Sequence, residues 1–254
     1  VIALGGTVGQ SIPGTPLLTI GGGARPRASP FAVRAVYAGW RGGIVPAHAD
    51  ATFEPGAPTM PLAAMLAAAL GVNEAFLHIA DDSRIAGRRS VGLSLWDPAV
   101  DWLAPAIEPR LQFMPSRLWL IGLGHLGQAY LWALGLLPDV EPSAPHLLLQ
   151  DTDIVTPSTE TTSILTTASM ISQHKTRITA AWAEQRGFTT TLTERPFDAQ
   201  TIRRSDEPAV ALCGVDNAEA RRCLDGAGFD FVVEAGLGRG HRDFHSILVH
   251  TLPG

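Results

Sequence analysis

The stretch from Leu118 to Gly127 reads Leu-Trp-Leu-Ile-Gly-Leu-Gly-His-Leu-Gly, and it is the most informative part of the chain. Four apolar residues lead into three glycines spaced as G-x-G-x-x-G, and an amphipathic segment follows. The pattern predicts a strand over 118–121, a tight turn, and a helix over 126–137. Such a turn lets a phosphate approach the backbone, beside the unpaired N–H groups of the helix start. Three glycines after a strand also occur in plain tight turns, so the motif alone leaves both readings open.

Strands and helices alternate along the rest of this half of the chain. Further strands are expected over 146–150, 189–193, 209–213, 229–234 and 244–250, and helices over 172–187 and 217–225. This alternation predicts an α/β, Rossmann-like domain with a mainly parallel sheet and flanking helices. Ligands of such sheets bind at the carboxyl ends of the strands, where the glycine turn lies.

The first part of the chain has a different pattern of expected strands and helices. Short strands are expected over 17–20, 32–37 and 91–96, a glycine turn over 21–23, and a helix over 61–77 that begins with proline. An irregular connector with four prolines follows over 97–115. We therefore expect an N-terminal α+β region over 1–112, without a recognised motif, and a nucleotide-binding domain over 113–254.

Composition excludes several classes of protein. The chain has 254 residues, 46% hydrophobic and 17% charged, with a net charge of −5 and no long basic run, so a nucleic-acid partner is not expected. Its two cysteines, Cys213 and Cys223, form no C-x-x-C pair, which argues against a disulfide framework or a zinc site. This cysteine usage fits a reducing cytoplasm, so we expect a cytoplasmic location. The N-terminus has no basic segment before an apolar run, so we expect no signal peptide.

One window resembles a membrane span. Residues 118–137 carry no formal charge over 20 positions, which is long enough to cross a bilayer. The three glycines at motif spacing, together with His125 and Gln128, instead favour a buried strand, turn and helix. No membrane association is therefore expected.

Three charged residues are placed where a nucleotide site needs them. Asp151 ends the strand 146–150 and can accept hydrogen bonds from a ribose, or it is a loop or helix-capping aspartate. Lys175 is the only lysine among 19 basic residues. It lies near the start of a predicted helix, where it can bind phosphate; the alternative is a solvated surface lysine. Asp216 follows the strand 209–213 and can hold Mg²⁺ against phosphates, or it caps the next helix.

Together these elements resemble the ThiF/MoeB family of ubiquitin-activating-type adenylating enzymes, over about residues 117–254. The glycine turn is followed by Leu-Gln-Asp-Thr-Asp-Ile-Val at 149–155, similar to the family's Asp-x-Asp-x-Val. Lys175 lies 24 residues after Asp151, where the family has its catalytic lysine. The segment Val-Asp-Asn-Ala-Glu-Ala-Arg at 215–221 resembles the family's Asp-Asn-x-x-x-Arg.

The resemblance implies a reaction. A carboxylate, often the C-terminal glycine of a ubiquitin-like or sulfur-carrier protein or a peptide, would attack the α-phosphate of ATP to give an acyl-adenylate and pyrophosphate. The resemblance makes Lys175 and Asp216 catalytic, and Asp216 the Mg²⁺ ligand. The implied nucleotide-binding residues are Gly122, Gly124, His125, Leu126, Gly127, Asp151, Asp153, Lys175, Asp216 and Asn217.

The chain departs from the family pattern at three positions. His125 replaces the usual second adjacent glycine, and Thr159 and Thr162 stand where the family has an asparagine and an arginine that contact the phosphates. Family members commonly act as dimers, so we expect a homodimer, or a pair with a related chain, that brings an arginine to the site. Two other functions remain open: an NAD(P)-dependent oxidoreductase, and a nucleotide-binding partner subunit that has lost the chemistry.

Overall fold

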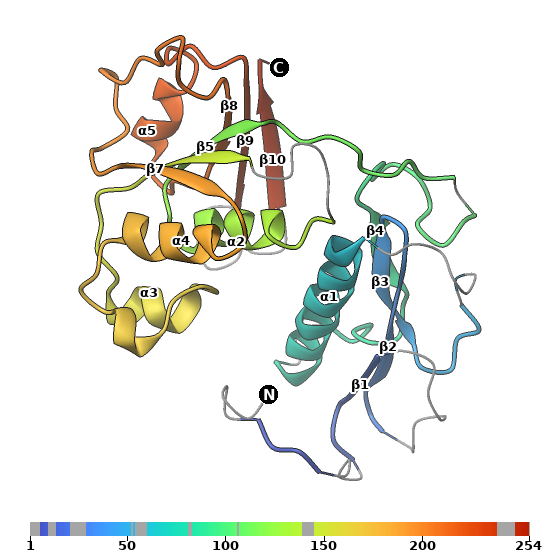
Figure 1. Cartoon of the computed structure of the whole chain (residues 1–254). Helices are drawn as coiled ribbons and strands as arrows, with labels where there is room; N and C mark the ends of the chain where they lie inside the picture. The colour runs from blue at the N-terminus through green and yellow to red at the C-terminus, as the bar shows by residue number, and fades with distance from the viewer. Residues whose placement is uncertain are drawn as a thin grey trace. The chain divides into compact units, whose positions relative to one another are not determined.

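The chain divides into two compact units, Val1–Arg110 and Leu111–Gly254 (Figure 1). The computed structural model describes residues 6–9, 14–20, 29–51, 53, 60–80, 83–105, 107–138, 145–237 and 247–253. The N-terminal five residues, the glycine turn predicted at 21–23 and the beginning of the strand predicted at 244–250 lie outside these ranges.

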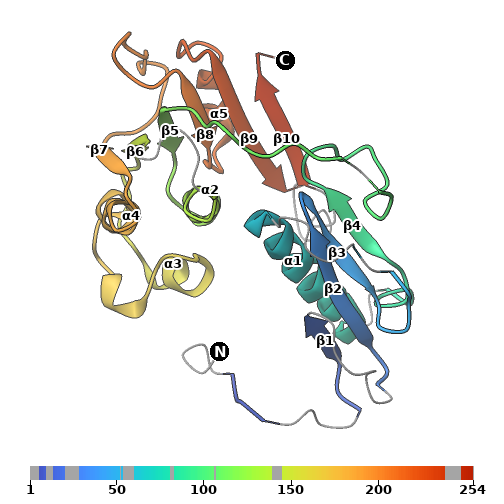
Figure 2. The same ribbon diagram turned by 45° about the vertical axis from the view of Figure 1, so that its right-hand side comes forward.

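The N-terminal unit is a four-stranded sheet with one helix on it. The strands β1 (Leu17–Ile20), β2 (Ala32–Ala38), β3 (Arg41–Pro46) and β4 (Val91–Ser94) lie side by side in that order. The pair β1–β2 is parallel and the other two pairs are antiparallel. The helix α1 (Pro61–Ile79) runs along one face of the sheet (Figure 2). The α+β character expected from the sequence is confirmed, but β3 was not predicted.

The helix α1 is tied to its own unit by a buried charge. The Glu74 side chain is fully buried, and it accepts hydrogen bonds from Arg89 Nη2 at 2.9 Å and from the Gly87 N–H at 2.8 Å.

The helix α1 is also long and apolar enough to cross a membrane, with a mean hydropathy of 1.6 over a window of which 28% is buried. A helix packed on a sheet can have the same length and composition, so this property alone assigns no membrane.

The C-terminal unit contains a six-stranded sheet. Its strands are β5 (Arg117–Ile121), β6 (His146–Gln150), β7 (Thr189–Thr193), β8 (Val210–Cys213), β9 (Phe231–Leu237) and β10 (Ile247–Leu252). They lie in the order β10-β9-β8-β5-β6-β7, and every neighbouring pair is parallel except β9–β10. The predicted mainly parallel α/β sheet is thus confirmed, and the apolar window at 118–137 forms a strand, turn and helix.

Helices cover both faces of this sheet. The helices α2 (His125–Leu134) and α4 (Lys175–Glu184) lie together on one face, and α5 (Ala218–Cys223) lies on the other (Figure 1). The helix predicted over 126–137 ends at Leu134, and Gly135 follows as its C-cap against the Trp182 ring. The helix predicted from Ser172 begins only at Lys175, because Ser172 has a left-handed φ of 74°.

A short helix, α3 (Pro157–Thr162), was not predicted. Its polar sequence Pro-Ser-Thr-Glu-Thr-Thr shows no apolar period, and it spans only six residues. Local capping defines it: Thr156 Oγ1 accepts a hydrogen bond from the Thr159 N–H at 3.3 Å, and the Thr159 hydroxyl in turn accepts from the Thr156 N–H at 3.3 Å. A 3₁₀ turn at Ala168–Met170 then leads towards α4.

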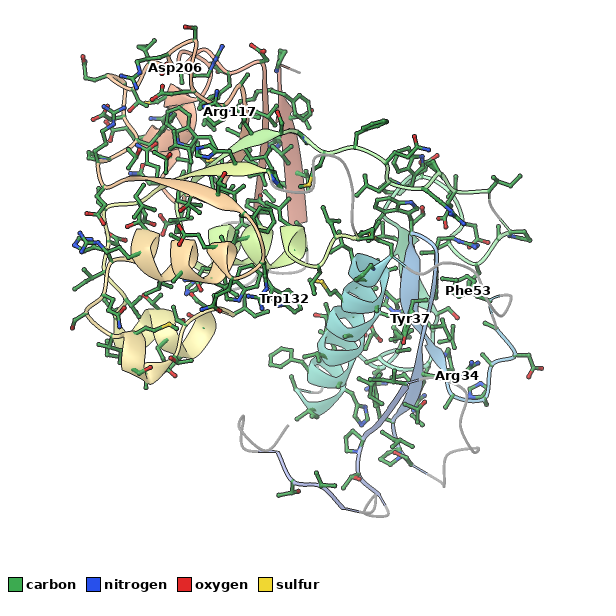
Figure 3. All side chains as sticks on the ribbon, viewed as in Figure 1. Arg34, Tyr37, Phe53, Arg117, Trp132 and Asp206 are labelled. Atoms are coloured by element: carbon green, nitrogen blue, oxygen red, sulfur yellow. The ribbon has the colours of Figure 1, made fainter. Side chains whose placement is uncertain are left out.

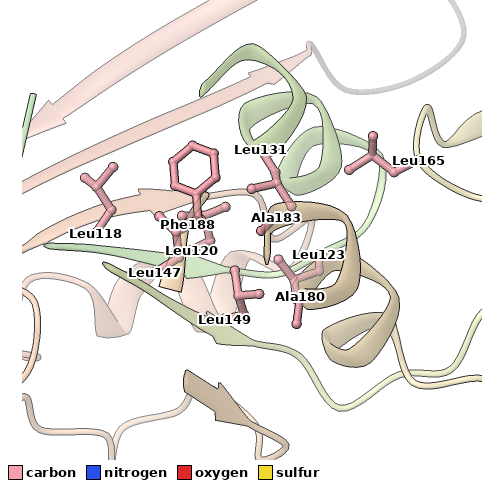
Figure 4. Close-up of a cluster of buried hydrophobic side chains, with 10 residues drawn as sticks. All are labelled: Leu118, Leu120, Leu123, Leu131, Leu147, Leu149, Leu165, Ala180, Ala183 and Phe188. Atoms are coloured by element: carbon pink, nitrogen blue, oxygen red, sulfur yellow. The ribbon is translucent and has the colours of Figure 1, made fainter. Parts of the chain in front are cut away.

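The central strand β5 is buried on both faces. Leu118 and Leu120 point to the α2 and α4 side, into the cluster of Leu123, Leu131, Leu147, Leu149, Leu165, Ala180, Ala183 and Phe188 (Figure 4). Trp119 and Ile121 point to the opposite side. Trp119 Nε1 also donates to Gln150 Oε1 at 2.9 Å, which satisfies the indole N–H inside the core. The core therefore fixes the carboxyl ends of β5 and β6, where the glycine turn begins.

Candidate functional site

The glycine turn brings three segments into close contact. Gly122 has a φ of +79°, a conformation that favours glycine. A Cβ added to Gly127 would overlap the Gly122 carbonyl, and one added to Gly214, just after β8, would lie 2.7 Å from the Gly127 nitrogen. The start of α2 is therefore held against the ends of β5 and β8 by glycines that have no side chain to separate them.

The start of α2 is open. Its N-cap residue, Gly124, makes no side-chain capping bond, and a Cβ added there would meet nothing within 4 Å. The helix α5 differs, since Asn217 Oδ1 accepts from the N–H groups of Glu219 at 2.7 Å and Ala220 at 3.3 Å. The uncapped N–H groups of α2 can therefore serve an anion.

Asp151 joins the end of β6 to the glycine turn. Its Oδ2 accepts from the Leu123 N–H at 2.6 Å, and its Oδ1 accepts from the Asp153 N–H at 2.7 Å. Asp151 thus lies in the loop after β6 and caps no helix, and both of its oxygens accept from backbone N–H groups. It fixes the position of the turn relative to the segment that follows β6.

Lys175 is held next to this segment. A backbone bridge between Ile154 and His174 aligns the two chain segments, and the Lys175 N–H donates to the Asp153 carbonyl at 3.0 Å. The Lys175 ammonium then donates to Asp153 Oδ2 at 2.8 Å, with 12% of the lysine side chain exposed. Hydrogen bonds therefore run without a break from the glycine turn through Asp151 and Asp153 to the single lysine.

Asp216 also lies beside the turn by its place in the chain. A Cβ added to Gly122 would lie 2.8 Å from a methyl carbon of Val215, the residue before Asp216. Asp216 itself is exposed. The alternative in which Asp216 caps α5 is wrong, because Asn217 is the cap.

Sequence reasoning missed one residue that positions the turn. Gln128 is fully buried; its Nε2 donates to the Leu123 carbonyl at 3.1 Å and its Oε1 accepts from the Leu165 N–H at 3.1 Å. It thereby ties the turn to the segment after α3. A lone amide in an otherwise apolar window was the available signal, since a buried polar group requires partners.

The two threonines that depart from the family pattern have different environments. Thr159 is buried, and its hydroxyl takes part in the cap of α3. Thr162 is exposed, and its Oγ1 is hydrogen-bonded to His125 Nε2. One of the substituted positions thus contributes to local structure, and the other contacts the first residue of α2.

Cys213 is a buried core residue, and Cys223 is partly buried against the same core cluster. Burial raises the pKa of the Tyr130 hydroxyl, on α2, to about 12. Burial likewise raises the pKa of the Cys213 thiol. A thiol with a raised pKa is protonated at neutral pH and is a poor nucleophile. Cys223 Sγ donates to the Glu219 carbonyl, one turn earlier in the chain, at 3.3 Å.

An open cavity of about 580 Å³ is present in the C-terminal unit. It is lined by β5, β6, β7 and the segment that follows β7, and Figure 3 labels two of its residues, Arg117 and Asp206. Its lining contains none of the predicted site residues. In the described part of the chain, no group of three or more His, Cys, Asp or Glu side chains is arranged to hold a metal ion.

Comparison with known proteins identifies the family. The family model described as the BilD C-terminal domain matches residues 114–254, and the model of the BilD N-terminal domain matches residues 1–95. The chain belongs to the BilD family. A curated relative, the bacterial E1-like protein BilD of Collimonas sp. (strain OK412), is 47% identical over 256 residues, which cover all of this chain. The chain spans 55% of the length of that relative.

Solved structures similar to this BilD family member are more distant. The E. coli tRNA N6-threonylcarbamoyladenosine dehydratase TcdA is 15% identical, with a TM-score of 0.41 over 48% of this chain and 52% of that chain. E. coli MccB, crystallised with ATP, is 13% identical, with a TM-score of 0.39 over 48% of this chain and 36% of that chain.

Proposed function

We propose that this chain binds ATP·Mg²⁺ at the glycine turn and transfers AMP to a carboxylate. The observation that carries the proposal is the continuous hydrogen-bonded path from Leu123 through Asp151 and Asp153 to Lys175. The path links the one lysine of the chain to the residue before the uncapped start of α2, and these two sources of positive charge would act together on one anion.

The residues present suit such a ligand. The open space at Gly124 and the free N–H groups of α2 would take phosphate oxygens, and Lys175 would move from Asp153 towards the phosphates as their charge shifts. Asp151, Asp153 and Asn217 would line the nucleoside side. Asp216 would hold Mg²⁺, which would supply charge neutralisation at the phosphates.

The transfer itself balances without another reactant. An oxygen of the acceptor carboxylate would form a bond to the α-phosphorus of ATP. The bond from that phosphorus to the bridging oxygen would break, and pyrophosphate would leave with the electron pair. The chain would contribute positioning and charge stabilisation.

The acceptor we propose is the C-terminal carboxylate of a ubiquitin-like or sulfur-carrier protein, or of a peptide. The E1-like description of the Collimonas relative supports this class of acceptor. We further propose a cytoplasmic homodimer, or a pair with a related chain; the free Cys213 and Cys223 fit a reducing compartment. Light scattering that shows a fully active stable monomer would rule out the dimer.

The main rival is an NAD(P)-dependent oxidoreductase, which shares the glycine turn and the strand-end acid. That function has no use for the ion pair between Lys175 and Asp153. A nucleotide-binding partner subunit without chemistry is the second rival, and the arginine missing at Thr162 favours it.

Calorimetric measurement of which nucleotide binds distinguishes these functions. We expect ATP·Mg²⁺ to bind and NAD⁺ and NADP⁺ to bind at least about ten-fold more weakly, a difference of about 1.4 kcal/mol. The matched protein control is Lys175→Met, which should weaken ATP binding but leave adenosine binding unchanged. Tight binding of NAD⁺ or NADP⁺ without ATP binding would instead establish the oxidoreductase. ATP binding without pyrophosphate exchange for any carboxylate acceptor would establish the partner subunit.

A further inference from the structure

The charges around the cavity of about 580 Å³ in the C-terminal unit do not balance. Three arginines and three carboxylates line it. Arg204 already holds two of these carboxylates, since its Nε lies 3.5 Å from Asp206 Oδ1 and 3.7 Å from Glu207 Oε1. The third, Glu194, accepts a hydrogen bond from Arg177 Nε on α4 at 3.0 Å. Each lining carboxylate therefore has an arginine partner, and two of the lining arginines are left without one.

These two arginines are Arg117 and Arg195. Within the described part of the chain, neither guanidinium forms a hydrogen bond or an ion pair. Burial lowers the pKa of His146, which is paired with Arg117 in the sheet and also lines the cavity, and the charge of Arg117 lowers it further. The charge of Arg117 thus acts on the cavity and is not neutralised by an acidic neighbour.

Both arginines extend from backbone that is held in place. Arg117 is the first residue of β5 and is paired with β6. The Arg195 carbonyl accepts from Gln150 Nε2 at 3.1 Å, and Gln150, which is fully buried, accepts in turn from Trp119 Nε1 at 2.9 Å. A core amide therefore fixes the Arg195 main chain relative to β6. A ligand would have to order the two side chains but not the backbone that carries them.

The rest of the lining indicates the kind of anion that fits. Leu148 and Ile202 contribute apolar surface, and Thr193 and Gln200 contribute side-chain donors that have no partner among the described residues. The volume lies within the range of small-molecule sites, about 300–1,000 Å³. Guanidinium forks match the oxygens of phosphate and carboxylate groups. The cavity therefore suits a small molecule that combines an anionic group with an apolar part.

We propose that this cavity is a binding site for a small organic anion, whose phosphate or carboxylate group is held by Arg117 and Arg195. Its lining contains none of the residues that form the proposed nucleotide site at the glycine turn. The inference is therefore independent of the proposed function, and either one can fail without the other.

The test is proton–nitrogen correlation NMR of the whole chain, titrated with phenyl phosphate, isophthalate and benzyl alcohol. These probes carry a phosphate, two carboxylates and no charge, respectively, on the same ring. We expect the amide signals of Thr191 and Arg195 to shift saturably with at least one of the two anions and not with benzyl alcohol. The signal of Leu123, in the glycine turn, should stay in place. The anion that binds more tightly identifies the group that the arginines prefer.

Substitutions test the roles of the two arginines. Arg117→Gln and Arg195→Gln should each weaken binding of that anion by roughly ten-fold, because each removes a charged hydrogen-bond donor. Arg186→Gln is the charge-matched control, since Arg186 follows α4 and lies outside the cavity lining, and its affinity should stay within about two-fold of the wild type. Thermal melting checks that all three variants stay folded.

Three results would overturn the inference. The first is that neither anion shifts the signals of Thr191 and Arg195. The second is that the shifts occur at Leu123 instead, which would place the anion at the glycine turn. The third is that Arg117→Gln and Arg195→Gln bind the anion as tightly as Arg186→Gln.

Discussion

Replacing Lys175 with alanine should lower the rate of ATP–pyrophosphate exchange by roughly 30- to 1000-fold while the protein stays folded. The expected loss corresponds to about 2–4 kcal/mol of transition-state stabilisation, the range for removal of one preorganised charge. The stability cost should be small, because the Asp153 side chain that loses its partner is 64% exposed and remains hydrated. Exchange assays and thermal melting on the same samples measure both effects.

Arg177→Ala is the matched control for this prediction. Arg177 lies two residues further along α4 and also holds a carboxylate, Glu194, but its side chain is 64% exposed on the helix surface. Exchange by this variant should stay within about three-fold of the wild type. Lys175→Arg should not restore activity, since a planar guanidinium fork cannot replace a compact ammonium. Equal rates for Lys175→Ala and Arg177→Ala would show that Lys175 has no part in the reaction.

Replacing Gly127 with alanine should give the largest loss of stability. The added Cβ would overlap the Gly122 carbonyl, which belongs to backbone that cannot rotate away as a flexible side chain would. Separation of α2 from the end of β5 would also disturb the buried contacts of Gln128. We expect a loss of about 3 kcal/mol in the free energy of unfolding, measured by urea denaturation.

Gly124→Ala is the control for Gly127→Ala. Gly124 has a φ of −75° and open space at its Cβ position, so alanine there should cost at most about 1 kcal/mol. ATP binding should nevertheless weaken, because the new methyl group lies where a phosphate would approach. If both variants lose the same stability, the close approach of α2 to β5 does not constrain the turn as described.

Much of the fold could be predicted from the sequence because its signals are local. The apolar run into spaced glycines, and the regular alternation of strands and helices after it, identified β5, α2 and the mainly parallel sheet. The strand β3 was missed because Arg41-Gly-Gly begins it without the usual alternation, although all six of its residues are buried. Its burial comes from α1 and the neighbouring strands, which the local sequence does not show.

The contacts of the candidate site were less predictable. Spacing indicated that Asp151 and Lys175 belong to one site, but the ion pair between Lys175 and Asp153 depends on the bridge from Ile154 to His174. That bridge closes a segment containing α3, whose polar sequence has no regular spacing of apolar residues that would predict a helix. The hydrogen bond between His125 and Thr162 has the same origin, since it joins residues 37 positions apart through α3.

The most direct test of the proposed adenylation is exchange of labelled pyrophosphate into ATP, with Mg²⁺ and candidate carrier proteins that end in glycine. We predict exchange that requires the carrier's free C-terminal carboxylate. It should disappear when that carboxylate is amidated, and it should fall by at least about ten-fold in Asp216→Ala, because Asp216 is the proposed Mg²⁺ ligand. Exchange that continues at the wild-type rate with the amidated carrier, or in Asp216→Ala, would contradict the proposed reaction.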